Sequence, residues 1–185
     1  MGTIMWANAI AITAVIVAIL SPIFGAIADT GGYRKLFLFL FTWICAFFSM
    51  LLYFPDSGDV YFALILFIVA NVSFEMGTVF CNSYLPELSE NHNSGFISGF
   101  AWGIGFVGGL IALFISLLIF PEMDVEAVKN INILVGIWLI IFSSPLFLFV
   151  NDRKSKKFRI SYVIASFYSI RNTFKDIAKY KLVIQ

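Results

Sequence analysis

Five long stretches of this chain are almost free of charged residues, and they constrain its fold more than any other feature. They cover residues 4–28, 36–54, 60–81, 96–120 and 131–150, and a single charged side chain, Glu75, lies inside them. A helix needs about 20 apolar residues to cross a bilayer, so each stretch is long enough to span one. We therefore predict an all-α fold, a polytopic membrane bundle of five transmembrane helices within residues 1–151.

The overall composition supports a membrane protein and excludes several other classes. Hydrophobic residues make up 61% of the chain and charged residues 12%, whereas soluble domains carry about 25% charged residues. The net charge of +1 offers no basic surplus for a nucleic-acid partner. The chain has one His, and its two Cys lie within apolar stretches, so we expect no metal site and no cofactor. No nucleophile and base occur in a pattern that indicates an enzyme.

Charged residues between the stretches predict the orientation of the bundle. Residues 29–35 contain two adjacent basic residues and the segment after residue 150 contains nine, whereas the loops at 55–59 and 121–130 are mainly acidic. Cytoplasmic loops accumulate Lys and Arg, so we expect residues 29–35 and the C-terminal segment to be cytoplasmic. In residues 152–185, apolar residues recur every three to four positions, which predicts a basic amphipathic helix at the membrane surface.

The first stretch is predicted to be a membrane-spanning helix and not a cleaved signal peptide. No Lys or Arg precedes it, and its apolar run is longer than the roughly 7–15 residues of a signal peptide. It would then run from the outside to the cytoplasm. We expect that a protein with this start and with the run at residues 181–185 lacks a preceding helix and further helices after the fifth.

Two motifs resemble a known transporter family. The loop after the first stretch carries Gly25, Asp29, Gly32, Arg34 and Lys35, and their spacing resembles the signature between the second and third helices of the major facilitator superfamily. The runs at residues 82–88 and 97–109 resemble the vacuole-effluxer branch, which comprises autophagy-related amino-acid exporters and prokaryotic relatives. Together, the similar segments cover roughly residues 21–110.

The resemblance implies that the five spans are helices two to six of a twelve-helix rocker-switch transporter, that is, part of its N-terminal half. Such a protein moves a small solute, with amino acids as a candidate class, through a path between its two halves. Its partners would be the lipid bilayer, the small-molecule substrate, the missing first helix and the C-terminal half. It would be an integral, multi-pass membrane protein, in the cell membrane if the organism is a prokaryote, and residues 152–185 would link the halves.

Two alternatives belong to other classes of protein. A five-helix scaffold or assembly subunit that transports nothing would have the same spans and the same loop charges. A membrane-embedded enzyme would need several polar residues converging at one depth of the bilayer, which the spans do not offer. Further apolar spans in the neighbouring genomic sequence would favour the transporter.

Glu75 is the most informative single residue. An ionisable group inside a span is costly in lipid, so it usually faces a bundle interior or a water-filled path. Asn71 lies one turn before it, and Asn82 lies near the same helix face two turns after it. We predict that these three residues line a substrate or proton path. The alternative is a protonated structural carboxylic acid that is hydrogen-bonded to a neighbour.

Glycines are concentrated in the fourth span and in the basic loop. Small residues four positions apart let membrane helices approach closely, which predicts a packing stripe, and an adjacent glycine pair adds a flexible point. The stripe consists of Gly95, Gly99 and Gly103, and the pair is Gly108 and Gly109. In the loop, Gly32 permits a tight turn with positive φ. That loop either latches the two halves of a transporter together or is a short interfacial hairpin with basic anchors.

Overall fold

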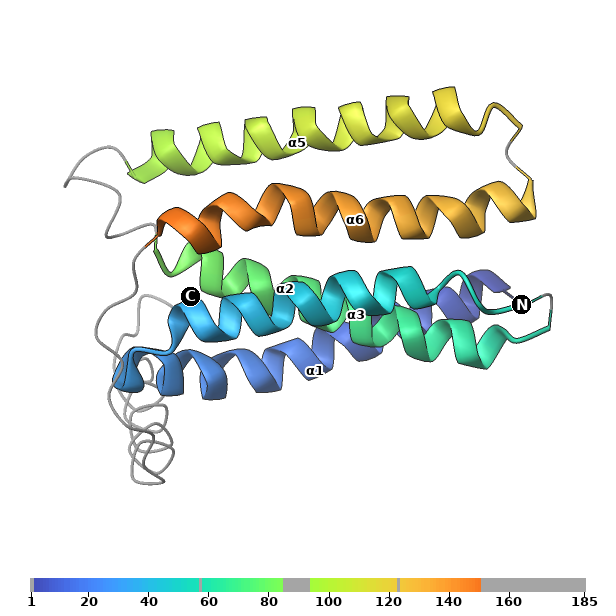
Figure 1. Ribbon diagram of the computed structural model, residues 1–185. Helices are drawn as coiled ribbons and strands as arrows, with labels where there is room; N and C mark the ends of the chain where they lie inside the picture. The colour runs from blue at the N-terminus through green and yellow to red at the C-terminus, as the bar shows by residue number, and fades with distance from the viewer. Residues whose placement is uncertain (1, 57, 85–93, 123, 151–185) are drawn as a thin grey trace, which may run out of the picture.

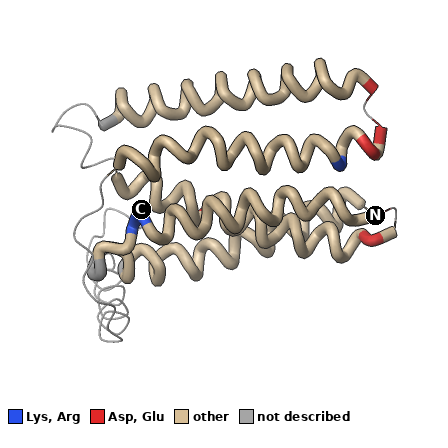
Figure 2. Tube along the Cα trace, in the orientation of Figure 1, with Lys and Arg blue, Asp and Glu red and all other residues tan. Residues whose placement is uncertain are grey.

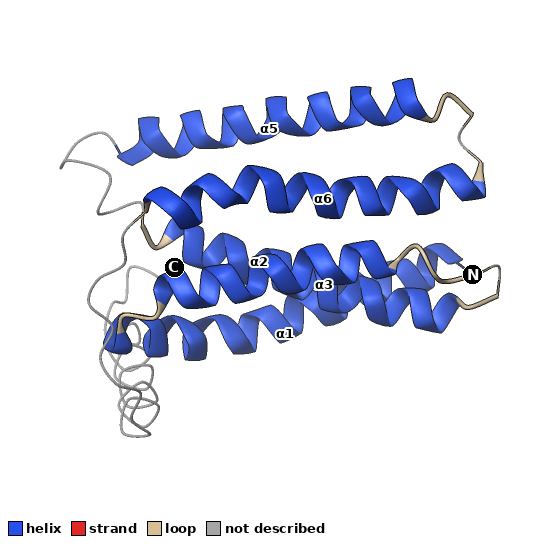
Figure 3. Cartoon of the chain, viewed as in Figure 1, coloured by secondary structure: helices blue, strands red, loops and turns tan. Residues whose placement is uncertain are grey.

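The computed structural model describes residues 2–56, 58–84, 94–122 and 124–150, and these residues form long helices joined by short loops (Figures 1 and 3). All five helices are long and apolar enough to cross a membrane, which confirms the predicted all-α bundle. Residues 85–93 and the expected amphipathic helix at 152–185 lie outside the described residues. The helices are α1 (Gly2–Gly31), α2 (Arg34–Leu51), α3 (Val60–Asn82), α5 (Ser94–Ile119) and α6 (Val125–Phe149).

A capping residue sets the start of α6, which the charge-free stretches do not mark. Helix α6 begins at Val125 and not at 131, because the Asp124 carboxylate accepts a hydrogen bond of 2.7 Å from the Ala127 amide. An acidic side chain at this position satisfies a free amide and interacts favourably with the helix dipole. The first turns of α6 are therefore helical, although they lie outside the charge-free stretch.

Helix α2 lies at the centre of the packed part of the bundle. It makes its most extensive contacts with α3 on one side and α6 on the other, while α1 packs mainly against α3. Helix α5 contacts little except α6 and lies at the edge of the bundle (Figure 1). Because consecutive helices run in opposite directions, α2 and α5 begin at the end of the bundle where α1, α3 and α6 finish.

The two ends of the bundle differ in charge (Figure 2). We call the end where α1 finishes and α2 begins the basic end, because Arg34 and Lys35 lie there. The other is the acidic end, where the α2–α3 and α5–α6 loops bring Asp56, Asp59 and Asp124 together with Lys129 of α6. The predicted orientation places the basic end in the cytoplasm.

Helices α2 and α6 approach each other closely at Gly136. A Cβ atom added to Gly136 would lie 2.8 Å from the carbonyl oxygen of Ala46 and would also collide with the Met50 side chain. Ala46 is fully buried, and so is Met76 on α3. Contacts between small residues of this kind hold membrane helices together, because lipid offers no hydrophobic driving force between them.

Aromatic side chains fill the basic end of the bundle. Phe80 of α3 is buried, and its ring stacks on Phe41 with a centroid distance of 5.8 Å. Phe24 of α1 meets Phe41 edge-on at 5.6 Å. These rings bury apolar surface among α1, α2 and α3 and fix the relative positions of the helix ends there.

Candidate functional site

Helix α3 has two chemically different faces. Its buried residues are small or apolar, namely Leu66, Ala70, Ser73, Met76, Gly77 and Phe80, and they lie on the side that packs against α1 and α2. With about 100° of rotation per residue, Asn71, Glu75 and Asn82 fall within about 40° of one another on the opposite side. Glu75 and Asn82 are exposed, and Asn71 is half-buried. We call these three residues the polar stripe.

The polar stripe extends well into the predicted membrane. Glu75 is sixteenth among the residues of α3, so it lies about 10 Å along the helix axis from Asn82 at the basic end. A carboxyl group at this depth, exposed on the surface of the described bundle, would be costly to place against lipid tails. The face of α3 that carries the polar stripe is therefore expected to meet water, substrate or another polar helix.

A cavity of about 180 Å³ lies near the polar stripe and is lined by residues of α2, α3 and α6. Its α3 lining includes Phe74, which precedes Glu75 directly, and Thr78, one turn further along the helix, and Ser143 is among its α6 lining residues. The Thr78 hydroxyl donates to the Phe74 carbonyl at 3.1 Å, so its hydrogen is used within the helix. The polar stripe itself does not line this mainly apolar cavity.

The predicted loop motif forms the turn between α1 and α2. Helix α1 runs through the position of Asp29 and ends at Gly31, and Gly32 then adopts a φ of +70°. The amides of Gly32 and Tyr33 both donate to the Ala28 carbonyl, at 2.9 and 3.1 Å, which is the left-handed cap that favours glycine. The side chain of Asp29 lies outside the described part of the chain, so its pairing with the basic residues stays a prediction.

The two basic residues of the motif contact different helices. The Arg34 guanidinium (Nη1) donates to the Ser83 carbonyl at the end of α3 over 3.4 Å, and the Lys35 ammonium donates to the Val150 carbonyl at the end of α6 over 2.5 Å. Gly25, the first residue of the motif, is half-buried in α1, and a Cβ atom there would have open space around it. The structure thus places Arg34 and Lys35 within this bundle, against helix C-termini.

The predicted packing stripe on α5 has no neighbour among the described residues. A Cβ atom added to Gly95, Gly99 or Gly103 would have no described side chain or other helix within 4 Å, and the same holds for Gly108 and Gly109. Within the described chain, the glycine that packs tightly is Gly136 of α6, which the sequence analysis did not single out. Its sequence signal was a lone glycine inside a span, and its importance comes from Ala46 on a distant segment. Packing through the α5 stripe remains a prediction.

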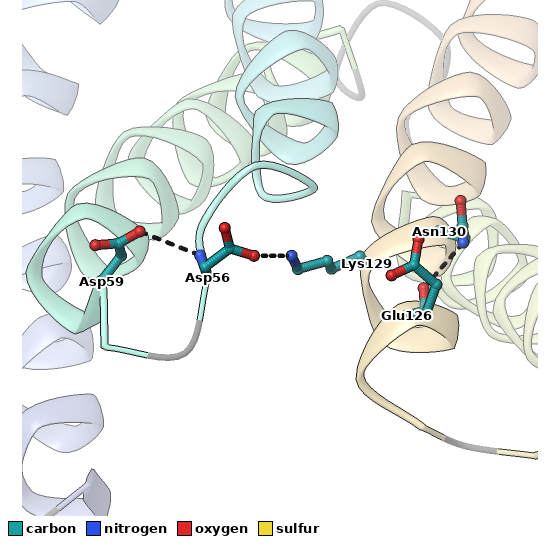
Figure 4. Close-up of polar contacts among 5 residues, drawn as sticks. All are labelled: Asp56, Asp59, Glu126, Lys129 and Asn130. Carbon is teal, nitrogen blue, oxygen red and sulfur yellow. Dashed lines mark hydrogen bonds and ion pairs between the residues drawn. The ribbon is translucent and has the colours of Figure 1, made fainter.

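The acidic end holds a second group of polar residues (Figure 4). The Lys129 ammonium of α6 forms an ion pair of 2.5 Å with Asp56 of the α2–α3 loop, and the Asp56 amide donates to the Asp59 carboxylate at 3.2 Å. These residues border a cavity of about 700 Å³ among the first turns of α1, α3 and α6. Among the described residues, no three His, Cys, Asp or Glu side chains are placed to hold a metal ion.

The five membrane-spanning helices define the chain as a multi-pass integral membrane protein, and comparison with known families specifies its class further. The family described as vacuole effluxer Atg22 like matches residues 3–185, so the chain belongs to this family. The description of this family and that of a bacterial relative reported below both concern transporters. The resemblance to the vacuole-effluxer branch of the major facilitator superfamily is thereby confirmed.

Individual relatives include bacterial and fungal proteins. The chain is 27% identical over 180 residues to an uncharacterized MFS-type transporter, YxiO, of Bacillus subtilis (strain 168), covering 93% of this chain and 42% of the relative. It is 27% identical over 161 residues to autophagy-related protein 22 of Pichia angusta, covering 72% of this chain and 29% of that protein. The chain thus spans less than half the length of these relatives. No solved structure gives a significant match.

Proposed function

We propose that this chain is part of a secondary transporter of its relatives' length and contributes helices that line the path of a small solute. The observation that carries the proposal is the polar stripe, which sets a carboxyl group on the exposed face of a membrane-spanning helix. Family membership supports transport as the activity. The matched lengths support the proposal that the remaining helices of the relatives complete the path.

Within this proposal, the polar stripe contacts the solute or a coupling proton. A carboxylate in a low-dielectric path can pair with an ammonium group or take up a proton, and the Asn71 and Asn82 amides can donate and accept hydrogen bonds. An amino acid presents both an ammonium group and a carboxylate, so amino acids are the first solute class to test. Glu75 supplies the partner for the cationic group and the amides supply neutral contacts.

The test replaces Glu75 by Gln in the transporter-length protein and measures the uptake of radiolabelled amino acids in proteoliposomes. Gln keeps the shape and the hydrogen bonding of the acid but cannot ionise, so transport is expected to be lost while membrane abundance stays unchanged. Glu122→Gln, in the exposed α5–α6 loop, is the matched control and should transport normally. Asn71→Ala should weaken the apparent affinity for the solute.

Two results would contradict the proposal. Wild-type transport with an unchanged pH profile in Glu75→Gln would make Glu75 a structural neutral acid. Reproducible uptake by the purified 185-residue chain alone would show that the helices of longer relatives are not needed. A transporter-length protein that folds but moves no solute from a broad panel would favour the five-helix scaffold.

A further inference from the structure

The basic residues Arg34 and Lys35 occupy an unfavourable position on their own helix. They are the first two residues of α2, where the helix dipole is positive, and the first turn of α2 contains no acidic residue. Cations at a helix N-terminus are destabilising, whereas cations at a C-terminus are stabilising. Their placement is therefore explained by something other than the stability of α2 itself.

The ends of α3 and α6 lack the cations that would stabilise them. Neither helix has a basic residue in its last turn, although each ends with carbonyl groups that have no partner within the helix. Ser83 and Val150 are the residues that cap these two ends. Their carbonyl oxygens are the acceptors for Arg34 and Lys35, respectively.

The arrangement of the helices allows residues of α2 to reach the ends of both α3 and α6. Helix α2 packs against both α3 and α6, and it begins at the end of the bundle where they finish. The tight turn at Gly32 starts α2 at once after α1, which places two consecutive side chains between the two helix ends. Arg34 thus brings a positive charge to the end of α3, and Lys35 brings one to the end of α6. The last turns of these two helices contain no basic residue.

We propose that Arg34 and Lys35 form a clamp at the basic end, in which each residue holds the C-terminal end of one neighbouring helix, α3 for Arg34 and α6 for Lys35. The clamp acts inside this bundle and does not depend on the proposed transport function. It assigns the two basic residues of the motif a fixed structural role, distinct from a latch that would engage a second half of a transporter. Through α6, the clamp also fixes the point from which the chain after residue 150 departs.

The test measures hydrogen–deuterium exchange of the 185-residue chain in phosphatidylcholine nanodiscs. Lys35→Gln should speed exchange in residues 146–150 about two- to fivefold, the range that one cation at a helix C-terminus provides, and should leave residues 79–84 unchanged. Arg34→Gln should do the reverse. The charge-preserving variant Lys35→Arg should keep wild-type protection, and Lys129→Gln, at the acidic end, is the control for loss of a cation elsewhere.

A rescue variant tests the electrostatic cause. Phe149 is 80% exposed in the last turn of α6, so Phe149→Lys can return a cation to that end without disturbing the core. In the Lys35→Gln background it should restore the protection of residues 146–150. The clamp is overturned if Lys35→Gln and Arg34→Gln leave both helix ends unchanged, or if each speeds exchange equally along the whole chain.

Discussion

Helices α5 and α6 are neighbours of similar length, and both contain glycine, yet their glycines have opposite surroundings. Helix α6 has one, Gly136, which is buried against the backbone of α2 at Ala46. Helix α5 has six, and within the described chain none has a side chain or another helix within 4 Å of the position of a Cβ atom. The number and spacing of glycines therefore do not predict where two helices pack tightly. Tight packing depends on which residues of a neighbouring helix lie opposite the glycine.

This difference divides the described bundle into a tightly packed part, formed by α1, α2, α3 and α6, and an open part, formed by α5. Helices α1, α2, α3 and α6 share close contacts and the aromatic cluster at the basic end, whereas most large side chains of α5 are exposed. Apolar side chains facing lipid need no explanation, but a glycine stripe exposes backbone and fills space poorly. The open face of α5 and the polar stripe of α3 are thus the surfaces for which the described chain supplies no cover.

The largest effect is expected from adding a single methyl group at Gly136, where α6 packs tightly against α2. Gly136→Ala would place a Cβ atom 2.8 Å from the Ala46 carbonyl oxygen, and a backbone atom cannot move aside as a flexible side chain can. Overpacking of this kind costs about 1–3 kcal/mol, so the unfolding temperature of the purified chain in detergent should fall clearly. The shortened Met50→Ala variant should not rescue it, because the collision with the backbone remains. An unchanged unfolding temperature would mean that α2 and α6 can separate freely.

The same substitution in the open part should have a smaller effect of opposite sign. Gly103→Ala adds a methyl group where there is open space and removes the helix penalty of glycine, which is roughly 0.5–1 kcal/mol. The unfolding temperature of the 185-residue chain should therefore stay constant or rise slightly. A clear loss of stability would show that α5 packs through its glycines even in this chain.

Bulkier side chains sharpen the comparison in the transporter-length protein. If a further helix covers the α5 stripe there, Gly99→Leu or Gly103→Leu should lower membrane abundance, while the 185-residue chain tolerates both. Equal abundance and unchanged transport in the longer protein would assign the stripe to lipid. This pair of measurements separates a packing surface from a lipid-facing one without knowledge of the partner helix.

Sequence patterns predicted the features that depend on local composition. The five spans, the turn at Gly32 and the common face of Asn71, Glu75 and Asn82 follow from hydropathy, glycine chemistry and helical spacing, and the fold agrees with each. Helix α6 begins before the charge-free stretch at 131–150, because Asp124 caps its start and its charged first turns are compatible with a helix. Hydropathy and residue spacing therefore predict the helices well, but they do not mark a helix start that depends on a capping hydrogen bond.

The remaining features depend on which helices become neighbours, and a single sequence does not specify that. The contact of Gly136 with Ala46 joins segments about 90 residues apart, and the bond from Lys35 to Val150 joins segments 115 residues apart. The basic pair was interpreted as an anchor or a latch because its helix-end acceptors belong to other spans. The substrate path was placed on Glu75 from its cost in lipid and remains a prediction.

The smallest effect is expected at the acidic end, where α6 is tied to the α2–α3 loop through Lys129 and Asp56 (Figure 4). Asp56 is 78% exposed, so solvent and salt screen this ion pair and its contribution to stability is small. Lys129→Gln should lower the unfolding temperature only slightly at low salt and not at all at high salt. Lys35→Gln should instead keep a measurable effect at high salt, because its carbonyl acceptor lies in a half-buried contact between packed helices. Equal salt sensitivity of the two variants would mean that both ends of α6 are held by surface charge alone.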